Sequence, residues 1–175
     1  MGDEGRLGTS DPPTAAVFKR LTYGVCVVGA AYAGKQDAFT AAWVMQVSFD
    51  PLLLALSINP SNASYALVIA ANAFAVSVLA RDQLQIARHF GTASGRDTDK
   101  MRAYEWRPAR TGSPILADAL AYLDCELTAR HRTGDHELLI GHVVDGALSS
   151  ASAVPMSYAD TGDLDGSSAL YPATF

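Results

Sequence analysis

Histidines and carboxylates in the last third of the chain are the residues best suited to proton transfer or metal binding. Gly134, Asp135 and His136 form a short run with the composition of a turn, and His131 and His142 stand on either side of it. Because a strand rises about 3.3 Å per residue, His136 and His142 would be about 20 Å apart on one strand and could not share an ion. Only His131 and His136 could approach each other across a hairpin, and two imidazoles with one carboxylate make a weak metal site. We expect no bound metal, and on local evidence an ordinary turn explains this run.

A second run is close to a phosphate-binding loop. Residues 29–36, GAAYAGKQ, differ by one residue from the pattern GxxxxGK[ST]. Gln36 has no hydroxyl group to coordinate magnesium, and the following residues alternate like a strand where a phosphate-binding helix should begin. A P-loop nucleotide-binding protein is therefore the least favoured class. The chain also lacks the GxGxxG pattern of a Rossmann dinucleotide site and the GxSxG pattern of a serine nucleophile.

The composition is that of one compact domain. The chain has 175 residues, 49% hydrophobic and 18% charged, which is enough to bury a core without disulfides or a structural metal. The formal net charge of -5 argues against general affinity for nucleic acid or for an anionic membrane. We expect neither nucleic acid nor a membrane among its partners.

Cysteine placement and the chain start indicate the compartment. Cys26 and Cys125 lie far apart in apolar stretches, which favours buried reduced thiols over a disulfide. Residues 1–16 are polar and contain acids, unlike a signal peptide, and no apolar run reaches the roughly 20 residues of a membrane helix. We therefore predict a cytoplasmic protein.

Strand patterns dominate the chain, with three short helices between them. Residues 122–129 alternate apolar and polar side chains, and a turn over residues 132–135 leads into residues 136–148, which predicts a hairpin. The other expected strands cover residues 23–32, 40–49, 52–58 and 74–79, with a turn over residues 33–37 after the first of them. One helix is expected to start at Thr14, and Ser64 and Asp82 are expected to cap the two others. Five or six strands joined by turns predict a mostly antiparallel barrel or sandwich. We divide the chain into a flexible arm (1–13), one domain (14–158) and a tail (159–175).

Charge is unevenly distributed along the chain. Residues 81–110 hold seven Lys or Arg and four Asp or Glu, a local charge of +3, whereas residues 133–175 hold six acids and no Lys or Arg. A phosphate-bearing ligand would prefer the first region, although a solvated surface loop explains the cations equally well. Residues 92–102 are expected to be exposed.

Many short motifs, taken in order, resemble those of the flavin reductase-like family. They are TAAWVMQVSFDPL (40–52), LSIN (56–59), Ser64, FAVSVL (74–79), ARHFG (87–91), GDH (134–136) and IGHV (140–143). The resemblance covers residues 18–158. It implies a six-stranded antiparallel FMN-binding split barrel of Greek-key type with short flanking helices, working as a homodimer.

The resemblance also implies which residues bind the cofactor and act on it. The 40–48 segment would pass the isoalloxazine ring, where small side chains let the main chain reach the polar edge of the ring. The 59–64 turn would approach the ribityl phosphate, with Arg81 and Arg88 as the nearest cations. His136 would lie near the nicotinamide and orient it, as the catalytic residue. The cofactor-binding residues so implied are Thr40, Ala41, Ala42, Trp43, Val47, Ser48, Asn59, Ser61, Asn62, Ser64, Arg81, Arg88 and Phe90.

The implied activity is an NAD(P)H-dependent flavin reductase. NADH or NADPH would deliver hydride to N5 of FMN or FAD, and the reduced flavin would pass electrons to oxygen, a free flavin or a partner monooxygenase. An FMN-binding electron-transfer flavoprotein without NAD(P)H activity is the alternative. The chain departs from the family pattern at Trp43, where a small or polar residue is common, at Leu52, and in its long acidic tail, whose Tyr158 and Tyr171 could cover the site or a neighbouring subunit. Trp43 could stack on the flavin or fill the core.

Overall fold

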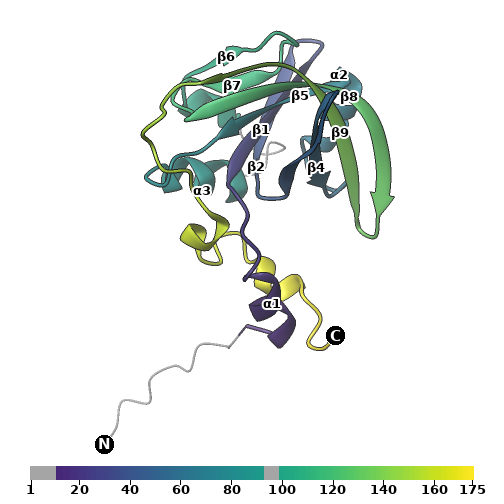
Figure 1. The fold of residues 1–175 in the computed structure, drawn as a ribbon, viewed down its shortest axis with the longest axis vertical. Helices are drawn as coiled ribbons and strands as arrows, with labels where there is room; N and C mark the ends of the chain where they lie inside the picture. The colour runs from purple at the N-terminus through teal and green to yellow at the C-terminus, as the bar shows by residue number, and fades with distance from the viewer. Residues whose placement is uncertain (1–10, 93–98) are drawn as a thin grey trace, which may run out of the picture.

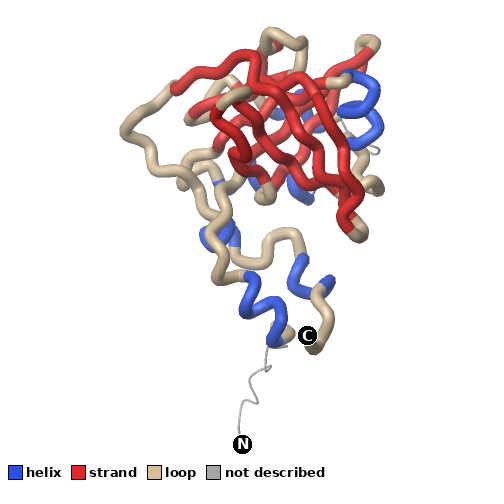
Figure 2. Tube along the Cα trace, turned by 45° about the vertical axis from the view of Figure 1, so that its right-hand side comes forward, coloured by secondary structure: helices blue, strands red, loops and turns tan. Residues whose placement is uncertain are grey.

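A computed structural model describes residues 11–92 and 99–175. Its centre is a seven-stranded sheet in the order β2-β1-β5-β8-β9-β4-β3, in which every neighbouring pair is antiparallel. Figures 1 and 2 show the sheet curling around a central core. In chain order its strands are β1 (Cys26–Tyr32), β2 (Lys35–Ala41), β3 (Val44–Phe49), β4 (Leu52–Ile58), β5 (Ala73–Val78), β8 (Ala121–Thr133) and β9 (His136–Leu148).

The predicted mostly antiparallel β fold is confirmed, with one difference in the number of strands. The main sheet has seven strands instead of six, and β6 (Trp106–Pro108) and β7 (Pro114–Leu116) pair separately. These two short strands escaped the sequence analysis because prolines stand at their ends and three residues are too few to show alternation. β7 packs against β1 and β5, and β6 pairs with β7.

The β8–β9 hairpin is the longest element and was predicted correctly. Thr133 pairs with His136 next to the turn, and Gly134 takes the positive φ of +67° that this turn requires. Its strands pair with β5 on one side and β4 on the other, and the tip extends beyond the body of the barrel (Figure 1). This hairpin places His136 at the end of the barrel.

The P-loop-like run is a β-hairpin. β1 and β2 pair from end to end, and the turn consists of Ala33 and Gly34, with φ of +51° and +78°. Lys35 therefore begins a strand and cannot stand at the start of a phosphate-binding helix. The turn is shorter than expected, and the expected strand over residues 40–49 is broken at residues 42 and 43, where the chain turns from β2 into β3.

Three helices flank the sheet, as expected, with small differences at their ends. They are α1 (Pro13–Phe18), α2 (Tyr65–Ala71) and α3 (Leu84–Thr92). α3 begins two residues after Asp82, and the Gln83 carbonyl accepts its first hydrogen bonds. The prediction that Asp82 caps the helix is wrong, because the chain is still in a turn at that residue.

The segment after α3 is partly buried. Residues 93–98 lie outside the described part of the chain, but η1 (Lys100–Ala103) contains Lys100 and Met101, each only 3% exposed. The expectation of an exposed segment is therefore wrong for these two residues. Lys100 tolerates burial because its ammonium group lies 3.4 Å from a carboxylate oxygen of Asp37 on β2.

The C-terminal segment is attached to the barrel at several points. Pro155 bridges to Ala80 and Ser157 to Gly24, and Met156 between them is 1% exposed. Two 3₁₀ helices follow, η2 (Tyr158–Thr161) and η3 (Ser167–Leu170). The end of the chain lies beside α1 below the barrel (Figures 1 and 2), so the two ends of the described chain form one projection.

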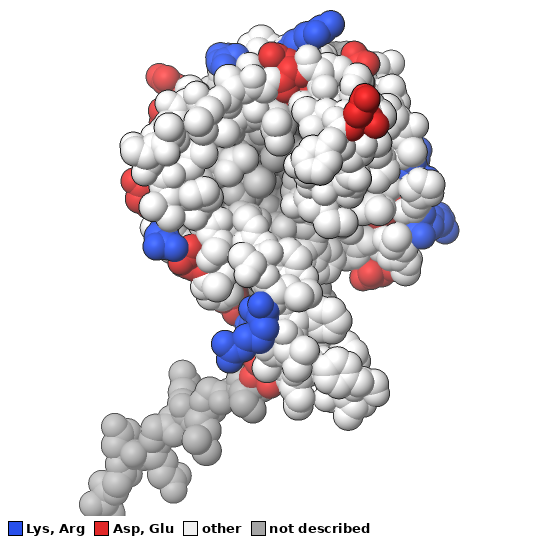
Figure 3. Space-filling view, in the orientation of Figure 1, with Lys and Arg blue, Asp and Glu red and all other residues white. Residues whose placement is uncertain are grey.

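The burial of the two cysteines agrees with the sequence analysis. Cys26 and Cys125 are both buried and free. On the face in Figure 3, Lys and Arg are interspersed with Asp and Glu around the edge, without a large patch of one sign. Among the described residues, no helix has the length and apolar character needed to cross a membrane.

Candidate functional site

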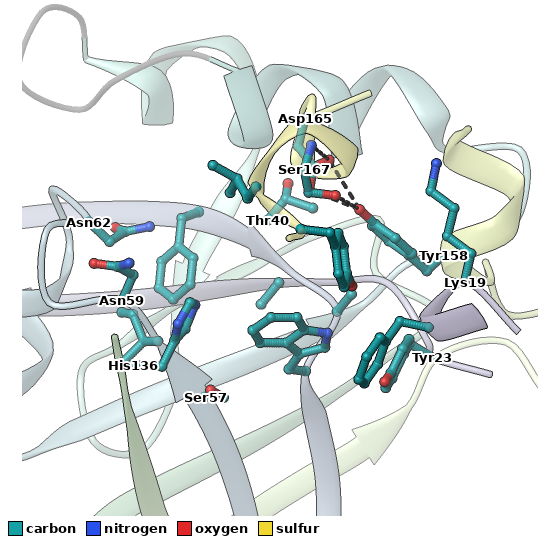
Figure 4. A pocket seen from close by; sticks show the side chains of 18 residues that line it. Lys19, Tyr23, Thr40, Ser57, Asn59, Asn62, His136, Tyr158, Asp165 and Ser167 are labelled. Carbon is teal, nitrogen blue, oxygen red and sulfur yellow. Dashed lines mark hydrogen bonds between the residues drawn. The ribbon is translucent and has the colours of Figure 1, made fainter. Parts of the chain in front are cut away.

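A cavity of about 230 Å³ opens where the β2–β3 corner, the end of β4 and the tip of the β8–β9 hairpin meet the C-terminal tail. Figure 4 shows its lining. Much of the wall is aromatic, with Phe39, Trp43, His136, Tyr158 and Tyr171 on it. An aromatic slot of this kind suits a flat, partly polar ring.

His136 contributes the only titratable group from the hairpin to this wall, among the residues described. Its Nδ1 lies 2.9 Å from Oδ1 of Asp135, and this hydrogen bond lowers the pKa of the Asp135 carboxyl. Its ring lies against the Trp43 indole, with ring centroids 4.9 Å apart. Nε2 has no hydrogen-bonding partner in the described part of the chain, so it can bind a ligand.

The corner between β2 and β3 is fixed on both sides. The Thr40 hydroxyl donates to the Ala87 carbonyl of α3 at 2.8 Å, and the Trp43 carbonyl accepts from the Ser57 N–H at 3.0 Å. Between them, Ala41 and Ala42 line the cavity with methyl groups only. Such small side chains leave the main chain within reach of a ligand.

The turn after β4 presents amide groups to the same cavity. Oδ1 of Asn59 accepts from the Ser61 N–H and Oδ1 of Asn62 accepts from the Ser64 N–H, each at 2.9 Å. Both asparagines line the cavity, and neither Nδ2 group has a partner among the described residues. These two amides are donors suited to a ligand oxygen.

The structure brings together seven of the residues predicted to act in the site: Thr40, Ala41, Ala42, Trp43, Asn59, Asn62 and His136. Seven others lie outside the cavity lining: Val47, Ser48, Ser61, Ser64, Arg81, Arg88 and Phe90. A role for this second group in ligand binding stays a prediction.

Several residues of the second group have other partners. Ser64 is fully buried and donates to Asp37 at 2.7 Å, so its hydroxyl does not cap α2 as expected. The Arg81 guanidinium lies 3.4 Å from the Asp160 carboxylate, and Phe90 is on the buried side of α3, in the core. These contacts join segments that are distant in sequence, so local patterns could not reveal them.

The C-terminal tail supplies one wall of the cavity, whereas the sequence analysis left open whether it covers the site or a neighbouring subunit. The Tyr158 hydroxyl lies 2.6 Å from the Ser167 hydroxyl and donates to the Asp165 carboxylate at 3.0 Å (Figure 4). Burial raises the pKa of Tyr158 to about 12, so this phenol stays protonated. Tyr158 and Tyr171, the two tail residues that the sequence analysis named, both line the cavity.

Positive charge is sparse at the cavity. Lys19 is its one Lys or Arg among the described residues, and it lies 2.8 Å from Asp11 and 3.7 Å from Asp163. The hydrogen bond to Asp11 raises the pKa of Lys19. None of the described cations of residues 81–110 lines the cavity, so the preference of a phosphate for that region stays a prediction.

The cavity suits part of a flavin nucleotide and does not suit a metal. Small-molecule cavities usually measure roughly 300–1,000 Å³, so this one fits a ring system with the rest of the ligand in the open mouth. The aromatic walls and the two free amides match a ring with a polar edge and an oxygen-rich tail. Among the described residues no group of three His, Cys, Asp or Glu could hold a metal, and His131 pairs with Leu138 instead of His136.

Known proteins resemble this chain in sequence and in fold. The flavin reductase like domain matches residues 18–165. High molecular weight rubredoxin of Moorella thermoacetica is 36% identical over 141 residues, 79% of this chain and 61% of the relative. The reductase subunit HsaB of a flavin-dependent monooxygenase of Mycobacterium tuberculosis is 31% identical over 146 residues, 83% of this chain and 74% of the relative.

Among solved structures, the NADH:FAD oxidoreductase SgcE6 of Streptomyces globisporus superposes with a TM-score of 0.77 at 26% identity. The match covers 83% of this chain and 86% of that chain. The predicted split-barrel fold is thereby confirmed. The chain spans less than two thirds of the rubredoxin, and it spans 24–26% of several diflavin flavoproteins that it also matches.

Proposed function

We propose that this chain, which belongs to the flavin reductase-like domain family, is an NAD(P)H-dependent flavin reductase. One observation carries the proposal: a single aromatic cavity collects the 40–43 corner, the Asn59 and Asn62 amides and His136 from three distant parts of the chain. Relatives named as a reductase subunit and as an NADH:FAD oxidoreductase support it. We propose FMN as the flavin, with FAD as the variant that the last of these relatives supports.

Different residues of the cavity are proposed to bind the ring and the phosphate tail of the flavin. Ala41 and Ala42 expose the main chain to the polar edge of the ring, and Trp43 and Phe39 supply apolar contact. The Asn59 and Asn62 amides donate to oxygens of the ribityl phosphate. A bound flavin supplies the two-electron chemistry, accepting at N5 a hydride from NADH or NADPH, while the protein supplies orientation.

His136 is proposed to orient the nicotinamide. Its Nδ1 already binds Asp135, which leaves Nε2 for a polar group of the incoming ring. Hydride transfer itself needs no proton from the protein. The proposed role of His136 is therefore to place the nicotinamide ring against the flavin ring.

Partners are proposed from the exposed surface and the relatives. β3 carries apolar side chains at the open edge of the sheet, with Met45 60% and Phe49 89% exposed, which suits a second copy of this chain. The resemblance to a monooxygenase reductase subunit supports delivery of electrons to a monooxygenase, to free flavin or to oxygen. We place the protein in the cytoplasm, where thiols such as Cys26 and Cys125 stay reduced.

A second candidate function has one observation in its favour. Lys19 is the one Lys or Arg among the described lining residues, and it already contacts two carboxylates. A cavity with so little free positive charge offers a nicotinamide nucleotide no strong contact for its phosphates. This favours an FMN-binding electron-transfer flavoprotein that receives its electrons from another protein.

An anaerobic absorbance experiment separates the two functions. Purified protein is loaded with FMN or FAD, and the flavin band is followed after addition of NADH or NADPH. Rapid bleaching supports the reductase, and His136→Ala should slow it while the flavin stays bound. His131→Ala, an exposed histidine of the same hairpin, is the matched control. Bound flavin that stays oxidised with both nucleotides would exclude the reductase and favour the electron carrier.

A further inference from the structure

Trp43 stands at a sharp change of direction in the chain. It follows the end of β2 and precedes β3, and its carbonyl accepts the Ser57 N–H of β4. Its side chain lines the cavity and is still 44% exposed, so it is not a core residue. A large aromatic side chain held half in solvent by a fixed backbone is well placed to contact a neighbouring ring.

That neighbouring ring is the imidazole of His136. The two ring centroids are 4.9 Å apart, with an angle of 53° between the planes, within the range of favourable aromatic pairs. Within the described part of the chain, the imidazole has one hydrogen bond, to Asp135, whose side chain is 84% exposed and adjacent in sequence. In Figure 4, His136 lies beside Asn59, at the opposite end of the cavity from Tyr158. Trp43 thus gives the imidazole a ring contact from a part of the chain that is distant in sequence.

We propose that Trp43 is a positioning residue, whose indole holds the His136 imidazole at a fixed tilt and thereby sets the affinity for the nicotinamide nucleotide. This inference rests on the proposed reductase function and adds to it a residue that departs from the family pattern. An imidazole without this ring contact would lose more side-chain freedom when it bound a ligand. Packing on Trp43 removes that freedom in advance, which lowers the entropic penalty of binding.

The first test needs neither flavin nor nucleotide. The chain has two tryptophans, so Trp106→Phe leaves Trp43 as the sole tryptophan reporter. In that background His136→Ala should change the intensity of Trp43 fluorescence, and His131→Ala should not. In proton NMR spectra, the ring-current shift of the His136 carbon-bound protons should be lost in Trp43→Leu and partly kept in Trp43→Phe.

The second test is steady-state kinetics with added flavin. Trp43→Leu should raise KM for the nicotinamide nucleotide about fivefold, with a smaller change in kcat, since an aromatic pair contributes about 1 kcal/mol. Trp43→Phe should recover most of the loss, and Tyr32→Ala, an exposed aromatic residue outside the cavity lining, should match the wild type. The combined variant of Trp43→Leu with His136→Ala should be little worse than His136→Ala alone, because the two residues act through one group.

Three results would contradict the inference, and each points to a different cause. An unchanged KM for the nucleotide in Trp43→Leu would show that Trp43 contributes only its proposed contact with the flavin and does not position His136. Spectra that do not respond to His136→Ala would show that the two rings do not pack. If the spectra respond but wild-type protein consumes no NADH or NADPH, the proposed function fails, and the nucleotide role of Trp43 fails with it while the contact stands.

Discussion

Next to His136 in sequence, Glu137 holds the tip of the hairpin to α2. Arg130 on β8 donates to both carboxylate oxygens, at 3.1 and 3.0 Å, and the Tyr65 hydroxyl donates to one of them. The hydrogen bond from Tyr65, followed by that from Arg130, lowers the pKa of Glu137. The beginning of β9, where His136 lies, is therefore fixed to β8 and α2 by this charged cluster.

This cluster predicts a pH dependence of stability. Because the pKa of Glu137 is lower in the folded chain than its ordinary value of 4.5, the carboxylate stabilises the fold above pH 4.5, and this contribution is lost as pH falls through the folded pKa. Glu137→Gln should therefore be less stable than wild type in urea unfolding at pH 7, and the difference should be smaller at pH 3. Glu126→Gln, an exposed carboxylate on β8, is the control. A difference that is equal at both pH values would exclude the ion pair as its source.

The two cysteines give a chemical prediction. Burial raises the pKa of Cys26 and of Cys125 to about 12, so neither thiol forms the reactive thiolate at ordinary pH. We expect native protein at pH 8 to resist Ellman's reagent and urea-unfolded protein to release two equivalents. Fast labelling of one thiol in native protein would show that the barrel opens locally at that strand.

At the scale of elements, β9 depends on a glycine where it crosses the barrel interior. A Cβ added to Gly141 would lie 2.7 Å from Cβ of Cys125 and 2.8 Å from Cζ of Phe74. Gly141→Ala should therefore destabilise the fold by about 1–3 kcal/mol in urea unfolding, since a packed core accepts an extra methyl group only by shifting. Gly24→Ala, where nothing lies within 4 Å of the added atom, should have a much smaller effect. Equal losses of stability at the two positions would show that Cys125 on β8 and Phe74 on β5 move aside for the added methyl group without strain.

The elements also show what could be predicted from the sequence. The β8–β9 hairpin and β4 were predictable, because alternation, apolar runs and turn residues act locally. The order β2-β1-β5-β8-β9-β4-β3 was not, since pairing of distant strands leaves no local pattern. In the same way Ser64 has the composition of a cap but bonds to Asp37, and Arg81 meets Asp160 of the tail. Seven of the residues that the family resemblance implies line one cavity, and their role stays a prediction. The sequence left open whether Tyr158 and Tyr171 cover the site or a neighbouring subunit, because the position of the tail depends on tertiary packing.

In the whole molecule, the two ends of the described chain form one unit below the barrel. The Thr14 hydroxyl donates to the Pro172 carbonyl, and the Phe18 and Tyr171 rings lie 5.5 Å apart. Phe18 and Tyr171 also line the cavity, so this unit is part of the site. Val17 and Leu170 on the same projection are 55% and 86% exposed, which leaves an apolar surface beside the cavity mouth.

The exposed apolar surface predicts a dimer that completes the site. β3 ends the sheet with an open edge, and Phe49 on it is 89% exposed, while the cavity within one chain is smaller than a whole flavin nucleotide needs. Phe49→Asp should therefore convert a dimer into a folded monomer, as measured by light scattering and circular dichroism, and should weaken flavin binding, because the second chain supplies the missing wall. Tyr32→Asp, on a different strand and 54% exposed, should leave both properties unchanged. A monomeric wild type would exclude the dimer, and a Phe49→Asp monomer that keeps full flavin affinity would show that one chain alone makes the site.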